Sequence, residues 1–276
     1  MTLSPILAWS LRLIQVPLPP SLSARRVKRF IALLSLALIA AALAFAVASG
    51  SRSSSRPAAP GDVGLFTSLP ILWNEYGELS ELLKPESESH WAVAVLAQRG
   101  TIRPLDRIAP LPQDLGLLVM AQPRPLSPDE NVALDQWVRG GGRVLLFADP
   151  MLTQHSHFPI GDRRRPEGTV LLSPILARWG VTLLFDEAQP AGLRTVDLFG
   201  QPAQVNLAGR LVPAAGTSHC RVEADGLAVL CSVGTGTVLI VADAALLEPA
   251  HEGDAGDRTS TQAAALNAVL DGTLAH

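Results

Sequence analysis

The sequence contains little charge and very little cysteine, and each shortage excludes a class of protein. Charged residues make up 17% of the 276 residues and the formal net charge is -3. The chain therefore lacks the basic excess with which proteins neutralise nucleic-acid phosphates, and we expect no nucleic-acid partner. Cys220 and Cys231 are the only cysteines, too few for a structural zinc site built on thiolates. We expect neither a bound metal nor another cofactor.

The motifs of nucleophilic catalysis are also missing. Neither Gly-x-Ser-x-Gly nor Gly-x-Cys-x-Gly occurs, and these are the patterns that place a nucleophile on a sharp turn after a strand. The glycine-rich stretch 233–237, VGTGT, precedes an apolar strand rather than a helix, so it lacks the geometry of a phosphate cradle. The residues therefore indicate no catalytic group and favour a non-enzymatic protein.

What the chain does contain is a clear strand-helix-strand unit over residues 117–150. Its first and last segments, 117–121 and 144–148, are short apolar runs of the kind found in parallel strands that are covered on both faces. Between them, Ser127 is a good N-cap, Pro128 suits the first helical position and Glu130 completes a capping box. Three glycines, 140–142, end the helix. A crossover of this kind is almost always right-handed.

The same unit carries a family resemblance. Residues 126–150, LSPDENVALDQWVRGGGRVLLFADP, resemble the signature of the GldG-type auxiliary proteins of ABC transporters. The likeness is good over residues 65–179 and thinner from there to 270. The resemblance implies an extracytoplasmic domain with a class I glutamine amidotransferase-like or flavodoxin-like fold. It also implies permease and ATPase subunits of an ABC transporter as partners. Asp149-Pro150 stands where the amidotransferases have their catalytic cysteine, so the resemblance implies no amidotransferase chemistry.

The remaining segments extend this unit into one domain, residues 63–276. Further apolar runs at 63–68, 101–105, 181–185 and 238–242 predict strands, and segments 90–99, 170–179 and 261–270 predict helices. From 195 to 233 the pattern changes to short alternating strands. The sum predicts an α/β fold, a three-layer sandwich with a mostly parallel sheet and an antiparallel β extension.

Residues 30–48 form an uncharged apolar run that is long enough to cross the roughly 30 Å hydrocarbon core of a bilayer. Four cations precede the run (Arg25, Arg26, Lys28, Arg29) and two follow it (Arg52, Arg56), which places segment 1–29 in the cytoplasm. Residues 49–62 form a Ser/Pro/Gly linker. We therefore expect a single-pass protein of the inner (cytoplasmic) membrane with its domain in the periplasm.

A signal peptide is the alternative interpretation of the same run. Ala46-Val47-Ala48 before Ser49 matches a small-residue cleavage site. Cleavage there would release a free periplasmic binding protein. The run and its charged lead are long for a signal peptide, which favours the uncleaved anchor.

Three apolar strands of the sequence end in an aspartate, namely Asp149, Asp186 and Asp243. Because the carboxyl ends of parallel strands form the ligand crevice of such sheets, three acids there could hold a divalent cation in a metal-dependent hydrolase. The simpler interpretation is that aspartates cap the turns that follow. Capping requires only local sequence, so we favour it.

Two loops leave the strand-end side of the predicted sheet, 70–88 and 151–167, and they carry aromatic and basic residues without a nucleophile. Loops on this side of such folds commonly bind partners. His-x-His can offer two imidazoles to a metal, but no further ligands follow at a fixed spacing. The expected partner-binding residues are Trp73, Tyr76, His155, Phe158, Arg163, Arg164 and Arg165.

The two cysteines flank a hairpin signal. Asp225-Gly226 favours a two-residue turn, which pairs Val222 with Val229 and therefore Cys220 with Cys231. Paired residues of neighbouring strands lie within disulfide range, and an exported domain is in an oxidising compartment. The spacing predicts a cross-strand disulfide.

Overall fold

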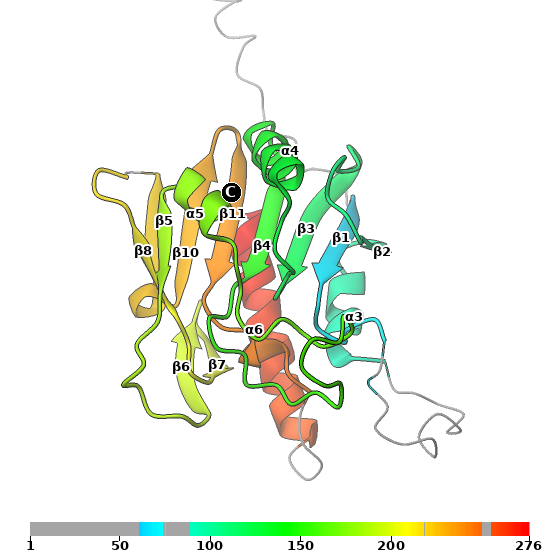
Figure 1. Ribbon diagram of the computed structural model, residues 1–276, viewed down its shortest axis with the longest axis vertical. Coiled ribbons are helices and arrows are strands. Elements are labelled where there is room, and N and C mark those ends of the chain that lie inside the picture. Colours follow the sequence, from blue (N-terminus) through cyan, green and yellow to red (C-terminus); the bar gives the residue numbers. More distant parts are fainter. Residues whose placement is uncertain (1–60, 74, 76–88, 218, 250–254, 276) are drawn as a thin grey trace, which may run out of the picture. The chain divides into compact units, whose positions relative to one another are not determined.

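The computed structural model describes residues 61–73, 75, 89–217, 219–249 and 255–275 (Figure 1). The chain divides into two units, 1–57 and 58–276, and the described residues belong to the second. The predicted segment 1–29, the span 30–48 and Tyr76 lie outside the described residues, as does the predicted linker up to residue 60. The sequence predicts that the linker reaches residue 62, but Asp62 already belongs to the first strand of the sheet. Within the described part of the chain, no helix is long and apolar enough to cross a membrane.

A seven-stranded sheet forms the centre of the domain, in the order β2-β1-β3-β4-β11-β10-β9 (Figure 1). Five neighbouring strands run parallel, and β10 and β9 complete one edge in antiparallel pairing. The prediction of an α/β fold with a mostly parallel sheet is confirmed. The strands are β1 (Asp62–Thr67), β2 (Ile102–Pro104), β3 (Leu115–Ala121), β4 (Arg143–Phe147), β9 (Cys220–Glu223), β10 (Ala228–Val233) and β11 (Gly236–Val241).

The strand-helix-strand unit forms as its local signals predict. Helix α4 (Pro128–Arg139) joins the parallel neighbours β3 and β4, and Ser127 and Glu130 make both bonds of the capping box. Glu130 is buried and also pairs with Arg124 at 2.9 Å. The Arg124 hydrogen bond is the main reason why the pKa of Glu130 falls to about 2. Gly142 is required because a Cβ there would lie 2.3 Å from the Trp137 ring.

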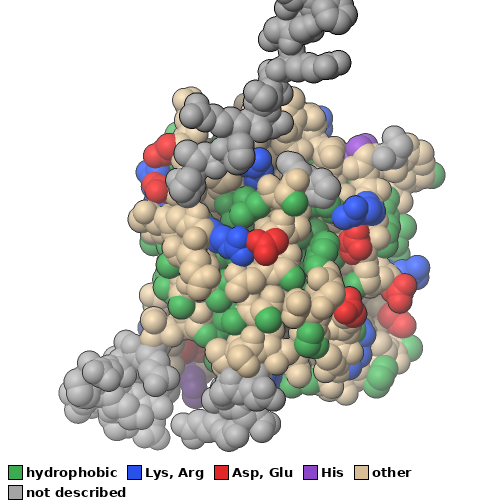
Figure 2. All heavy atoms as spheres, turned by 180° about the vertical axis from the view of Figure 1, so that it is seen from behind, with side chains coloured by type: hydrophobic (Ala, Val, Ile, Leu, Met, Phe, Trp, Pro, Cys, Tyr) green, Lys and Arg blue, Asp and Glu red, His purple; other side chains and the backbone are tan. Residues whose placement is uncertain are grey.

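Helices cover both faces of the sheet. On one face, α4 and α5 (Ser173–Arg178) share a core with strand residues such as Met120 and Leu146. On the other face, α3 (Trp91–Ala97) and α6 (Ala255–Leu274) pack on residues such as Val119 and Leu145. The alternation of neighbouring strand residues between the two cores is what a sheet buried on both sides requires. Figure 2 shows the side opposite to that of Figure 1, where cationic and anionic side chains are interspersed among apolar ones.

One predicted strand does not join the parallel sheet. Residues 181–185 form β5 (Val181–Leu184), which pairs antiparallel with β8 (Arg210–Pro213) in a separate two-stranded sheet. Strand β5 is buried on one side only, since Val181 is buried whereas Leu184 is 49% exposed. A strand inside a parallel sheet that is covered on both faces would be buried on both sides. A third small sheet consists of β6 (Arg194–Leu198) and β7 (Gln201–Val205).

The hairpin β9–β10 has the predicted register. Asp225 and Gly226 occupy the two central turn positions with φ values of 54° and 93°, and the Leu227 N–H donates to the carbonyl oxygen of Ala224 at 3.0 Å. Val229 lies opposite Val222 and Cys231 lies opposite Cys220. The two cysteines are joined by a disulfide with a Cα–Cα distance of 4.0 Å.

Replacement of both Cys220 and Cys231 by serine is expected to lower the free energy of unfolding by about 3 kcal/mol, because the disulfide closes a short loop and reduces the entropy of the unfolded chain. Urea denaturation of the variant and of the reduced wild-type protein measures this effect, and the two should agree. Mass spectrometry after alkylation without reduction should find no modified thiol. Two alkylated cysteines would contradict the prediction.

Candidate functional site

The carboxyl ends of β3 and β4 are tied together by one buried amide, that of Gln122. This residue directly follows β3, is fully buried and has a left-handed φ of 44°. Its Nε2 donates to the carbonyl oxygens of Asp149 (3.0 Å) and Glu167 (2.8 Å), and its Oε1 accepts the N–H of Asp149 at 2.9 Å. The amide thereby fixes both ends of the segment 150–166. Sequence reasoning missed Gln122, whose only signal is a polar residue placed directly after a buried strand.

Strand β1 is connected to the same network through Ser68. The Ser68 hydroxyl donates to the Gln122 carbonyl oxygen and accepts the N–H of Glu167 at 3.0 Å. The neighbouring Thr67 hydroxyl donates to the carbonyl oxygen of Ala121 at 2.8 Å. Three adjacent parallel strands therefore hold the end of the loop 151–167 at one edge of the sheet.

Asp149 and Asp243 lie side by side at this edge, and both carboxylates accept backbone N–H groups. Asp149 accepts from Met151 through Oδ1 (2.8 Å) and from Ala244 through Oδ2 (3.0 Å). Asp243 accepts from Ala245 through Oδ1 and from Asn206 through Oδ2 (2.8 Å). Each of the four oxygen atoms has a backbone donor, which is the capping arrangement that the sequence favoured.

Burial sets the acidity of the two aspartates. It raises the pKa of Asp149 to about 6, although the N–H groups of Ala244 and Met151 act in the opposite direction. Burial also raises the pKa of Asp243 well above its usual value, and the neighbouring Asp149 charge adds to the rise. The carboxylate of Glu248, which accepts the Thr153 hydroxyl at 3.0 Å, contributes to both.

The predicted convergence of three aspartates is wrong for Asp186. Since β5 lies outside the parallel sheet, its carboxyl end does not share the edge where Asp149 and Asp243 lie. Asp186 is exposed, and its Oδ1 accepts the N–H of Ala188 at 2.9 Å. Across the described residues, no group of three His, Cys, Asp or Glu side chains is placed to hold a metal ion.

The second feature is an aromatic-arginine cluster formed by Trp73, Phe158 and Arg164. The rings of Trp73 and Phe158 have centroids 6.0 Å apart. The Arg164 guanidinium lies 4.1 Å from the centroid of the Phe158 ring and forms an ion pair with Asp162 at 2.7 Å. The structure thus brings together three of the residues predicted to bind a partner, from two loops far apart in the sequence.

Hydrogen bonds order the backbone under this cluster. The Glu75 carboxylate accepts the Ser156 hydroxyl (2.9 Å) and the N–H of His157 (2.9 Å), so it connects the two loops. The Ser156 hydroxyl also accepts the N–H of Phe158 at 3.2 Å, and Arg165 donates to the Phe158 carbonyl oxygen. Neither Glu75 nor Ser156 was singled out from the sequence, because their role depends on contact between separate loops.

Apolar surface around this ordered cluster is open to solvent. Trp73 is 37% exposed and Ile160 is 93% exposed. His155 and His157 are exposed, with ring centroids 5.2 Å apart, and Arg163 is exposed as well. Ordered apolar side chains at the surface, rimmed by charge, are typical of protein-binding sites.

Comparison with known families gives one match, over residues 63–191, to a family described as "ABC-type uncharacterized transport system". The match supports an auxiliary component of an ABC-type transport system. It covers the parallel sheet as far as β4, the loop 151–167, α5 and β5. No curated protein matches the chain.

The solved structures that match are distant in sequence. An exo-β-1,4-mannosidase from Opitutaceae bacterium strain TAV5 shares 17% identity with a TM-score of 0.47, over 75% of this chain and 35% of that one. A catalytic mutant of a GH42 β-galactosidase from G. stearothermophilus shares 13% with a TM-score of 0.40, over 68% and 28%. A cytoplasmic protein from Salmonella typhimurium LT2 shares 13% with a TM-score of 0.40, over 68% and 88%. The chain spans about a third of the length of the glycosidases, and none of these likenesses bears on its activity.

Proposed function

We propose that this protein is a membrane-anchored, non-enzymatic accessory component of an ABC-type transport system, of the GldG type. In this proposal residues 30–48 cross the inner membrane, segment 1–29 is cytoplasmic and the domain 63–276 is periplasmic. The family match at 63–191 supports the transport role. The observation that carries the docking role is the ordered, exposed cluster of Trp73, Phe158 and Arg164 beside the strand ends.

The chemistry of this cluster suits a protein partner. Trp and Arg are enriched among the residues that dominate binding energy at interfaces. Because Phe158 holds both Trp73 and Arg164, their side chains lose little further rotamer freedom on binding. We infer that the transporter permease, whose extracytoplasmic loops would lie on the same side of the membrane, offers an apolar pocket with acidic groups to receive them.

The arrangement of the acids favours docking over catalysis. The metal-dependent hydrolase alternative requires Asp149, Asp186 and Asp243 to converge with free oxygen atoms. Instead, Asp149 and Asp243 use their oxygens to accept backbone N–H groups, and Asp186 follows a strand of another sheet. The parallel sheet covered by helices on both faces also supports the amidotransferase-like fold that the GldG resemblance implies.

Replacement of Trp73 or Arg164 by alanine is expected to weaken association with the permease at least tenfold, while the free energy of unfolding changes by less than about 0.5 kcal/mol. Co-purification from membranes and titration with the isolated permease measure the loss. Arg107→Ala is the matched control, because Arg107 is 69% exposed against 66% for Arg164 and is likewise paired with an aspartate. Equal loss in the Arg107 variant, or no loss in either cluster variant, would refute docking through the cluster.

A separate experiment tests the proposed membrane topology. Protease added to spheroplasts should digest the domain, and N-terminal sequencing of the membrane form should find the chain uncleaved after Ala48. A mature N-terminus at Ser49 would favour the free periplasmic binding protein. A domain protected from the protease would contradict a periplasmic location altogether.

A further inference from the structure

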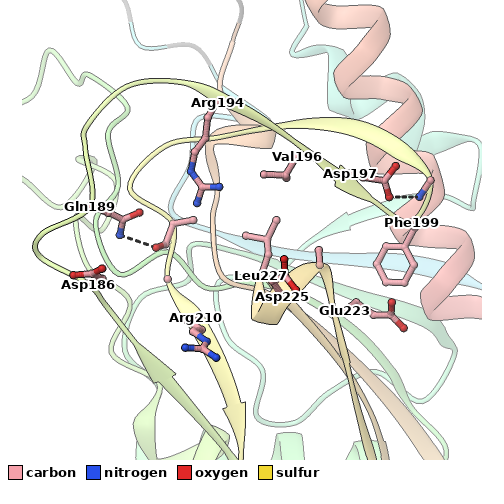
Figure 3. A pocket seen from close by; sticks show the side chains of 14 residues that line it. Asp186, Gln189, Arg194, Val196, Asp197, Phe199, Arg210, Glu223, Asp225 and Leu227 are labelled. Atoms are coloured by element: carbon pink, nitrogen blue, oxygen red, sulfur yellow. Dashed lines mark hydrogen bonds between the residues drawn. The ribbon is translucent and has the colours of Figure 1, made fainter.

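An open hollow of about 760 Å³ lies between the small β-sheets (Figure 3). It adjoins the carboxyl end of β11, because its lining residue Gly209 donates its N–H to the carbonyl oxygen of Ala242 at 2.7 Å. Its volume is in the range of small-molecule sites, roughly 300 to 1,000 Å³. Four parts of the chain form it: the segment after β5, the β6–β7 hairpin, the start of β8, and the turn before β10. Most of its lining follows residue 191, where the family match ends.

Side chains of both charge signs line this hollow. Figure 3 shows Arg194 and Arg210 reaching in from opposite sides, with acidic side chains around them. Among the described residues, neither of these arginines forms an ion pair, and Asp225 forms none either. The acidic lining residues are Asp186, Asp197, Glu223 and Asp225. Glu223 is already paired with Arg221. The other charged lining residues form no ion pair among the described residues, which leaves them available to a ligand.

The backbone around the hollow is held in an unusual conformation. Five described residues other than glycine have a left-handed φ, and three of them, Phe199 (54°), Ala224 (47°) and Asp225 (54°), line the hollow. Phe199 and Asp225 are central residues of the tight β6–β7 and β9–β10 hairpin turns, which require a positive φ, and Ala224 directly precedes the second turn. The Phe199 ring is seated against Gly272 of α6, where a Cβ would come within 3.3 Å of it. The hollow therefore has fixed walls.

The charge pattern selects the class of ligand. Three carboxylates without an ion-pair partner among the described residues (Asp186, Asp197, Asp225) against two guanidinium groups disfavour a simple anion, and the two unpaired guanidinium groups disfavour a simple cation. A metal ion is not indicated, since the hollow belongs to the described part of the chain, where no three metal-ligating side chains cluster. We propose that the hollow binds a small zwitterionic ligand of the amino-acid or short-peptide class. Its ammonium group contacts Asp225 and its carboxylate contacts Arg194, independently of any docking to a transporter.

The direct test is calorimetric titration of the full chain in detergent with the tripeptide Gly-Lys-Gly. The peptide with free termini is expected to bind, and the same peptide acetylated at its N-terminus and amidated at its C-terminus should bind at least tenfold more weakly, because it lacks both terminal charges. Equal binding of the two would show that only the lysine side chain is recognised and would overturn the proposal. Absence of binding of the peptide with free termini at millimolar concentration would also overturn it.

Variants locate the binding to this hollow. Arg194→Gln and Asp225→Asn are each expected to weaken binding of the free tripeptide about tenfold, the loss of one charge-assisted hydrogen bond. Asparagine tolerates the left-handed conformation at 225, so this variant keeps the turn, and Arg194 is exposed at the start of β6. Arg107→Gln and Asp114→Asn are the controls, each 69% exposed and outside the hollow. Equal weakening in these controls would show non-specific attraction and refute the site.

Discussion

Replacement of Gln122 by alanine is expected to lower the free energy of unfolding by about 3 to 5 kcal/mol, the largest effect that we expect of any polar side chain in this domain. The alanine removes three hydrogen bonds at once, two of them buried and one, to Glu167, partly buried. It leaves the N–H of the fully buried Asp149 and the carbonyl oxygen of Glu167 without their amide partner. The carbonyl oxygen of Asp149 is less affected, because it also accepts the N–H of Val170 at 3.0 Å.

Two further variants separate the hydrogen bonds of Gln122 from its volume. Gln122→Glu keeps the shape but turns a carboxylate oxygen toward the two carbonyl oxygens, and it should be at least as destabilising as alanine at neutral pH. Gln136→Ala, on the exposed side of α4, should change the free energy of unfolding by less than about 0.5 kcal/mol. Urea denaturation measures all three. A Gln122→Glu protein as stable as wild type would show that the amide bonds are not what holds the strand ends.

The same substitution links stability to the proposed docking. Gln122 anchors the two ends of the segment 150–166, and this segment contributes Phe158 and Arg164 to the aromatic-arginine cluster. A folded Gln122→Ala protein should therefore also bind the permease more weakly, although Gln122 itself is buried. The effect on binding should be smaller than that of Trp73→Ala, since the Glu75 bonds to Ser156 and His157 still connect the two loops.

Local signals account for what the sequence predicted well. The cap at Ser127, Pro128 and Glu130 defines the start of α4, because a helix cap needs only neighbouring residues. The same holds for the turn at Asp225-Gly226, which sets the register that brings Cys220 opposite Cys231. These features required no knowledge of the rest of the domain.

Long-range pairing accounts for what the sequence did not show. Strand β11 lies beside β4 although residues 148–235 separate them, and β5 between them in sequence is excluded from the sheet. Apolar content alone did not distinguish β5 from a buried strand, because its alternation of buried and exposed residues appears only once β8 is beside it. The error at Asp186 follows directly from this.

The candidate site likewise has some features that follow from the sequence and others that depend on contacts between distant segments. That the loops carrying Trp73 and Phe158 leave one edge of the sheet follows from the direction of parallel strands. That their rings meet, and that Glu75 connects the two loops, depends on side-chain contacts between separate segments. The bonds of Gln122 likewise join three segments, so no single window of sequence contains them.

Acidification from pH 7 toward pH 4 is expected to raise the free energy of unfolding of the wild-type protein relative to that of an Asp149→Asn variant. The pKa of Asp149 is raised from 3.8 to about 6 in the folded state, mainly by burial. The folded protein therefore binds the proton more tightly than the unfolded chain does. The stabilisation is fully present below the unfolded value of 3.8 and is lost as the pH rises through about 6. A rise of this size corresponds to about 3 kcal/mol, and Asp243 acts in the same direction.

Other groups titrate in or near this window, so the measurement must compare variants rather than follow wild type alone. Burial lowers the pKa of His90, which opposes Asp149, because the stability that a neutral buried histidine retains at high pH is lost on acidification. The pKa of Glu130 is lowered to about 2, so its contribution changes only below about pH 4.5. Both groups are present in wild type and in the Asp149→Asn variant, and their effects cancel in the difference between the two proteins.

Urea denaturation of both proteins at several pH values between 4 and 7.5 gives that difference directly. At pH 4 wild type should be the more stable, because the protonated carboxyl group of Asp149 still has two oxygen atoms facing the Met151 and Ala244 N–H groups, whereas asparagine turns its NH₂ group toward one of these donors. By pH 7 the difference in free energy of unfolding between the two proteins should have changed by about 3 kcal/mol in favour of the variant, because the variant buries no charge at this position. Asp114→Asn, at an exposed position, should show no comparable pH dependence. A difference between wild type and Asp149→Asn that stays constant over the whole range would mean that Asp149 does not titrate there, and that its backbone donors outweigh its burial.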